Sequence, residues 1–185
     1  YQVEKEILDR QGIIFYPSDK EQNEAYLSFY IEVINSTELN TEDKSLFIEW
    51  RKKFIEDENS SLLNFKNENH PFKKFSNGIF YFHKLDFKQA KDNFKEAYEN
   101  ADDGPLKDSA LYLCMRSSIK YAERSFDGYD RNQIDKNEIE NIHLLRDEYL
   151  KKFPSGKFVQ SVFDLGRWLL VLEQKYAEHQ STLDK

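Results

Sequence analysis

The chain has 185 residues, a length that suits one domain or one run of short repeats. Its 27 basic and 34 acidic side chains give a net charge of -7, and an acidic surface opposes binding to nucleic-acid phosphates. Aromatic residues make up 15% of the sequence, too much apolar ring for a disordered acidic chain. A single cysteine excludes an internal disulfide and a multi-cysteine zinc site. We therefore expect a folded domain that binds no nucleic acid.

Helical signals begin in the N-terminal region, residues 1–70. A capping box at Ser18 precedes apolar residues at three- and four-residue spacing, which predicts a helix over 19–34. A second helix is expected after Thr41, because acidic residues follow there and favour a helix N-terminus. The polar stretch 56–69 is interpreted as a loop.

Further helices are expected in the rest of the chain. Pro71 and Pro105 suit first helical turns, where the missing amide hydrogen is tolerated. The expected ranges are 71–84, 87–100, 105–125, 135–153 and 157–173. Almost nothing has the alternation of a strand, and 6 Gly and 4 Pro are few for an all-β protein. The sequence therefore predicts an all-α fold.

Small and aromatic residues recur at fixed spacings over residues 71–105, at Gly78, Tyr81, Ala90, Phe94 and Ala97. Small residues are needed where two paired helices cross closely, and rings fill the space beside them. In this pattern residues 71–105 resemble a tetratricopeptide (TPR) unit. A longer Asp-Asp-Gly-Pro break over 102–105 replaces the usual final proline of the repeat.

Two later motifs carry a second resemblance. Residues 110–113 read Ala-Leu-Tyr-Leu and are followed by Arg116, while residues 149–154 read Tyr-Leu-Lys-Lys-Phe-Pro. They are similar to the start and stop of repeat units in bacterial outer-membrane-assembly lipoproteins of the YfiO/BamD-like type. Met115 departs from this pattern, since glycine is common there, and the connection between the helices is longer than usual. A third unit would start at Phe158 and be cut short.

The resemblance implies a short right-handed solenoid of antiparallel helix hairpins over 71–185, preceded by an N-terminal helical region over 1–70. An unrelated helical bundle is the alternative. The resemblance also favours the periplasm or cell envelope of a bacterium, although the low cysteine content suits the cytoplasm equally. No apolar stretch approaches the roughly 18–20 residues that span a bilayer. Because the chain begins with Tyr1, we expect a fragment or a processed form.

In such a stack the first helix of each unit lines a concave groove, which the resemblance implies is a partner site. The predicted groove residues are Phe75, Ile79, Phe82 and His83 from the first unit, Tyr112, Arg116 and Lys120 from the second, and Phe163 and Arg167 from the third. Rings with two arginines suit an extended peptide or a partner carboxylate. The alternative is that both arginines pair with acids of the chain itself.

Catalytic and metal-binding motifs are missing from the sequence. The four histidines form no His-Glu-x-x-His pattern, and the glycines form no phosphate loop. Cys114 lies in an apolar helix and is interpreted as a small buried hydrophobe. Asp127, Asp130 and Asp135 partly match a calcium loop but lack its closing glutamate. We therefore expect no enzyme, no cofactor and no metal.

The sequence thus predicts a non-enzymatic scaffold or adaptor of a bacterial cell that binds a protein or peptide partner. A small-molecule or lipid-binding helical envelope protein is the alternative, motivated by the aromatic content. A hydrolase is a third, resting only on the many carboxylates and the four histidines. A homodimer is also predicted if the truncated last unit leaves Trp168, Leu169 and Leu172 partly uncovered.

Overall fold

The computed structural model describes residues 20–56, 61–127, 136–167, 169–170 and 173. Within these ranges the chain forms helices and no strand, which confirms the all-α prediction. The helices are α2 (Lys20–Asn35), α3 (Thr41–Glu56), α4 (Pro71–His83), α5 (Phe87–Asn100), α6 (Pro105–Asp127) and α7 (Lys136–Lys152). A C-terminal helical segment follows over residues 159–167 and 169–170. None of the described helices is long and apolar enough to cross a membrane.

The starts of α3, α4 and α5 are fixed by side chains that precede them. The Asn40 carbonyl oxygen Oδ1 accepts from the amide of Asp43 at 2.9 Å, and Asp86 accepts from the amide of Gln89 at 3.1 Å. At α4, His70 Nδ1 is the cap and Pro71 occupies the first turn. The predicted helix starts at these places are therefore confirmed. The predicted capping box at residue 18 lies outside the described residues.

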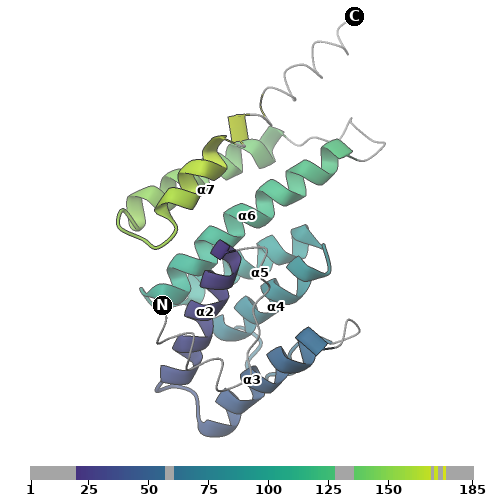
Figure 1. Ribbon diagram of the computed structural model, residues 1–185, viewed down its shortest axis with the longest axis vertical. Coiled ribbons are helices and arrows are strands. Elements are labelled where there is room, and N and C mark those ends of the chain that lie inside the picture. Colours follow the sequence, from purple (N-terminus) through teal and green to yellow (C-terminus); the bar gives the residue numbers. More distant parts are fainter. Residues whose placement is uncertain (1–19, 57–60, 128–135, 168, 171–172, 174–185) are drawn as a thin grey trace, which may run out of the picture.

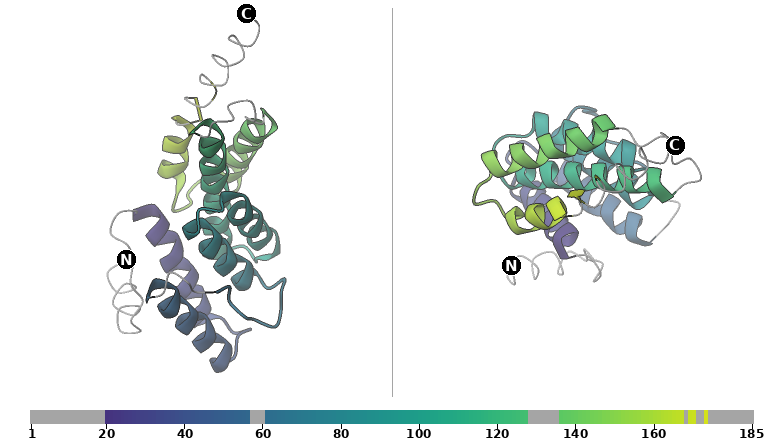
Figure 2. Two further views of the ribbon diagram at one scale, coloured as in Figure 1. Left: turned by 90° about the vertical axis from the view of Figure 1, so that its right-hand side faces the viewer. Right: turned by 90° about the horizontal axis from the view of Figure 1, so that it is seen from above.

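Helix α6 is the central element of the fold. Figure 1 shows α4 and α5 on one side of it and α7 toward the opposite end of the molecule. Along the chain, α4 packs on α5, α5 on α6, and α6 on α7. Helix α2 also packs against α6 and touches α3 and α4, and Figure 2 shows α2 and α3 side by side. The N-terminal pair of helices is therefore attached to the later hairpins rather than separate from them.

The α4–α5 hairpin depends on a close approach at Gly78. A Cβ atom added to Gly78 would lie 2.6 Å from the ring of Phe94, well inside van der Waals contact. Ala90, Phe94 and Ala97 on α5 are fully buried. The small residues that were predicted to let two helices cross therefore stand at a real helix crossing.

Aromatic rings join the N-terminal region to the first hairpin. The Phe29 ring of α2 stacks on the Phe75 ring of α4, with centroids 4.8 Å apart. Phe29 also meets Phe47 of α3 edge-on at 6.2 Å and Phe72 of α4 at 5.8 Å. The hydrophobic core thus continues across the predicted boundary at residue 70.

Tyr149 holds the end of α7 against α6 and the C-terminal segment. Its hydroxyl donates to the carboxylate of Asp108 and accepts from the amide of Phe158 at 3.0 Å. The second Asp108 oxygen accepts from the amide of Lys157, also at 3.0 Å. Gly156 makes the turn possible, because an added Cβ would lie 2.7 Å from the Tyr149 hydroxyl. Tyr149, the first residue of the predicted stop motif over 149–154, therefore joins α6, α7 and the C-terminal segment.

Candidate functional site

Three of the predicted groove residues lie in the interior. Phe75 and Ile79 are fully buried, and Tyr112 is 2% exposed. Phe75 is covered by Phe29 of α2, and Tyr112 stacks on Phe158 with centroids 4.4 Å apart. The prediction that these three side chains face a partner is therefore wrong: Phe29 of α2 covers Phe75, Phe158 covers Tyr112, and Ile79 belongs to the core.

Two of the predicted groove residues, Phe82 and Arg116, contact each other in the structure. The Arg116 guanidinium lies over the Phe82 ring, 5.8 Å from its centroid, and Nη1 donates to the Tyr112 hydroxyl at 3.4 Å. His83 packs against the ring of Phe54 at 5.3 Å. Phe82, His83, Arg116 and Lys120 are all half-buried and keep contacts within the chain.

Phe163 and Arg167 are on the outer surface of the C-terminal segment. Phe163 is 53% exposed, and the Arg167 side chain is 84% exposed. Arg167 lies 3.7 Å from the carboxylate of Asp164, one turn away in the same helix. Leu169, predicted to be uncovered, is 1% exposed because it joins the core. Trp168 and Leu172, predicted alongside it, lie outside the described residues.

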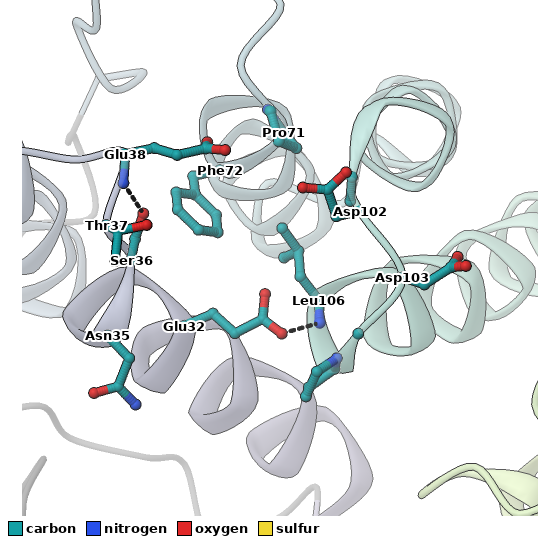
Figure 3. Close-up of a pocket in the computed structure, with 13 residues that line it drawn as sticks. Glu32, Asn35, Ser36, Thr37, Glu38, Pro71, Phe72, Asp102, Asp103 and Leu106 are labelled. Atoms are coloured by element: carbon teal, nitrogen blue, oxygen red, sulfur yellow. Dashed lines mark hydrogen bonds between the residues drawn. The ribbon is translucent and has the colours of Figure 1, made fainter.

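A cavity with a volume of about 340 Å³ opens where four helix ends meet (Figure 3). It lies between the end of α2 with the connection over 36–38, the start of α4, and the connection over 101–104 that leads into α6. Its lining carries four carboxylates, from Glu32, Glu38, Asp102 and Asp103, and no basic side chain. We call this cavity the acidic cavity.

Local hydrogen bonds hold the walls of the acidic cavity. Ser36 Oγ accepts from the amides of Glu38 at 3.2 Å and Leu39 at 3.3 Å, which folds the connection after α2. Glu32 Oε1 accepts from the amide of Leu106 at 2.8 Å (Figure 3). Glu32 thus caps the N-terminus of α6 from a different helix, where a negative charge is favoured.

The four carboxylates are not equivalent. Asp103 points away from the acidic cavity (Figure 3), and lies 3.6 Å from Lys107 and 3.5 Å from Lys152. Asp102 points toward the start of α4 (Figure 3), and it has no ion pair with a residue that the structure describes. Glu38 is 4.0 Å from His70 Nε2, a long contact. The negative charge facing the acidic cavity is therefore only partly compensated.

Burial shifts the pKa of Glu32. Removal from water raises the pKa of this carboxyl above its ordinary value, and the hydrogen bond from the Leu106 amide opposes the rise. The floor is apolar, since Phe72 is 7% and Leu106 3% exposed. Acidic walls above an apolar floor suit a side chain with an aliphatic stem and a cationic head.

The rest of the described chain offers little reactive chemistry. No three or more His, Cys, Asp or Glu residues in the described ranges are placed to hold a metal ion. Burial raises the pKa of the Cys114 thiol to about 12, which leaves it protonated at neutral pH. Asp130 and Asp135 of the partial calcium loop, and the side chain of Asp127, lie outside the described residues.

No protein-family model, curated protein or solved structure matches the chain. The similarity of residues 71–105 to a TPR unit, and of the later motifs to lipoprotein repeats, therefore stays a prediction. Sequence reasoning missed the acidic cavity because two of its carboxylates come from α2 and the connection after it, and the other two from the connection before α6, more than sixty positions later. The signal in the sequence is the Asp-Asp pair in the break over 102–105, which by itself indicates only a departure from the repeat.

Proposed function

We propose that the protein is a non-enzymatic helical scaffold that binds a protein partner at the acidic cavity. The observation that carries the proposal is a cavity of about 340 Å³ with a partly apolar floor and no basic lining residue, lined by Glu32, Glu38 and Asp102, while Asp103 points away from it. A lysine or arginine of the partner would lay its stem on Phe72 and direct its charge to Glu38 and Asp102. The partner surface differs from the concave groove expected from the sequence.

The arrangement of helices supports a scaffold of the TPR-like, right-handed solenoid kind. Helices α4 and α5 are joined by a turn of three residues, cross closely at Gly78, and are followed by α6 and α7, packed in sequence. Helix α2 lies against α4 and α6, the first helices of the two proposed units. Because α2 already covers part of the face that such repeats use for binding, we place the partner at the helix ends that form the acidic cavity.

A peptide selection tests the proposed function. Peptides selected from a random displayed library on the whole protein should contain lysine or arginine, and calorimetry should give their dissociation constants. The double variant Glu38→Gln/Asp102→Asn should weaken binding by about tenfold or more, because two charge-assisted contacts are lost. The matched control is Asp103→Asn, whose carboxylate points away from the cavity, and its affinity should stay within about twofold. Equal affinities for the double variant and the parent protein would overturn the proposal.

The other functions predicted from the sequence gain no specific support. The aromatic content that suggested a small-molecule or lipid ligand is accounted for by rings packed on one another around Phe29, Phe47 and Phe75. The hydrolase and the bacterial envelope location stay predictions. A homodimer also stays a prediction, with Leu144 at 68% and Leu170 at 62% exposure as apolar surface near the C-terminal end.

A further inference from the structure

The C-terminal helical segment carries large exposed side chains on its outer side. Phe163, Arg167 and Leu170 are each more than half exposed, and spacings of four and three residues place them on one side of a helix. Val162 and Leu169, on the inner side, are buried in the core. The segment lies at the end of the molecule farthest from α3 (Figure 1), and no described helix covers its outer side. We call Phe163, Arg167 and Leu170 the outer stripe.

The sequence around the outer stripe is apolar on every side. Between residues 158 and 172 it carries only two charged residues, Asp164 and Arg167. A helix with apolar residues all round is typical of one that is buried all round. The core covers only the inner side of this segment, because Phe163 and Leu170 remain exposed. A second surface is therefore expected against the outer stripe.

The charges favour a second copy of the chain as that surface. The net charge of -7 opposes self-association over most of the molecule, but Asp164 and Arg167 cancel each other here. Within one chain their contact is 3.7 Å long and largely exposed, so it contributes little to stability. Each chain thus offers one acid and one base that can pair with the same two residues of another chain. The outer stripe is complementary to itself.

We propose that the protein forms a homodimer in which the outer stripes of two chains pack antiparallel about a two-fold axis. Residues related by such an axis contact each other reciprocally. An axis between positions 166 and 167 places Phe163 of each chain opposite Leu170 of the other. It also brings Arg167 of each chain to within about 3 Å, measured along the helix, of Asp164 of the other. The apolar pairs supply the buried surface, and the ion pairs fix the antiparallel register. This interface differs from the one expected from the sequence, since Leu169 belongs to the core.

Light scattering of the whole protein during gel filtration tests this proposal. The parent protein should have twice the mass of one chain and should dissociate on dilution. Phe163→Asp should be monomeric, because it would place a carboxylate against the apolar side chain of the second copy. Leu85→Asp is the matched control, since it adds the same charge to a half-exposed leucine in the α4–α5 turn, and it should remain a dimer. A dimer that survives Phe163→Asp would contradict the proposal. So would a monomeric parent, which would mean that another segment of the chain or a different protein covers the outer stripe.

Charge exchange tests the register and the identity of the partner. Asp164→Arg leaves two bases on each segment and Arg167→Asp leaves two acids, so each variant alone should dimerise at least about tenfold more weakly than the parent. An equimolar mixture of the two variants restores both ion pairs between chains and should recover a dimer of parent-like affinity. Both side chains are more than half exposed, so neither change disturbs the core. A mixture that stays monomeric would rule out the antiparallel arrangement. The acidic cavity has no part in this interface, so either proposal can fail without the other.

Discussion

The hydroxyl of Tyr149 on α7 donates a hydrogen bond to the buried carboxylate of Asp108 on α6, although 41 positions separate them in the chain. Burial raises the pKa of Asp108, and the hydrogen bonds from Tyr149 and from the Lys157 amide oppose this rise. A carboxylate in this position is stable only while its donors remain in place. The packing of α7 and the C-terminal segment against α6 therefore depends on the hydroxyl oxygen of Tyr149.

Removal of that oxygen should destabilise the protein. Tyr149→Phe leaves Asp108 without one donor and the Phe158 amide without its acceptor, which should lower the free energy of unfolding by about 1–3 kcal/mol. Urea denaturation measures the difference. Tyr98→Phe is the control, because the Tyr98 hydroxyl donates to the exposed Glu148 and its loss should cost less. Equal losses for the two variants would contradict the assigned role of Tyr149.

Gly78→Ala should destabilise the α4–α5 hairpin. The new methyl group would lie 2.6 Å from the Phe94 ring, and overpacking of about 1–3 kcal/mol outweighs the gain in helix propensity of roughly 0.5–1 kcal/mol. Gly166→Ala is the matched control in a helix, because its Cβ would make only ordinary contacts with Arg146, the nearest at 3.5 Å. That variant should be as stable as the parent or slightly more stable. Thermal unfolding of both variants checks the sign of each change.

Stability should fall in mild acid through His70. Burial lowers the pKa of this imidazole below 6.5, with Glu38 and Asp43 opposing the shift, and its Nδ1 accepts from the Phe72 amide at 3.3 Å only when unprotonated. The unfolded chain binds the proton more readily, so this contribution is present above pH 6.5 and is lost as the pH falls through the lower native pKa.

The His70→Asn variant isolates this effect from the other titrating groups. Asparagine caps a helix without titrating in this range. The stability of His70→Asn relative to the parent should therefore increase as the pH falls below about 6.5. Urea unfolding at several pH values measures the difference, and a difference that is independent of pH would show that the cap does not titrate.

Cys114 should be unreactive in the native protein. It is 1% exposed, and burial raises the pKa of its thiol to about 12, so both access and thiolate are lacking. Because the sequence has one cysteine, the reaction of an aromatic disulfide reagent reports this thiol alone. The native rate should be at least about a hundredfold below that of the urea-unfolded chain, given how little thiolate remains at neutral pH. Rapid native labelling would contradict the buried position.

The helices could be predicted from local signals, but the surface could not. Capping residues such as Asp86, and prolines at 71 and 105, mark helix starts through contacts within one turn. Gly78 could be assigned to a helix crossing because its distance along the chain from Ala90 and Phe94 fits one hairpin. Such signals involve residues close together in the chain, so they can be recognised in the sequence alone.

The burial of three predicted groove residues could not be predicted, for the opposite reason. Whether Phe75 faces a partner depends on where Phe29 of α2 lies, and no local pattern gives that position. The acidic cavity likewise needs Glu38 and Asp102 to meet from distant connections.

The bond from Glu32 to the Leu106 amide has a consequence for synthesis of the protein. The two residues are 74 positions apart, so the glutamate leaves the ribosome well before the amide that it caps. Until then α2 can pack on α3 and α4, but the Glu32 carboxylate has no α6 amide to accept from. Helix α2 therefore completes its native contacts only after the start of α6 has left the ribosome.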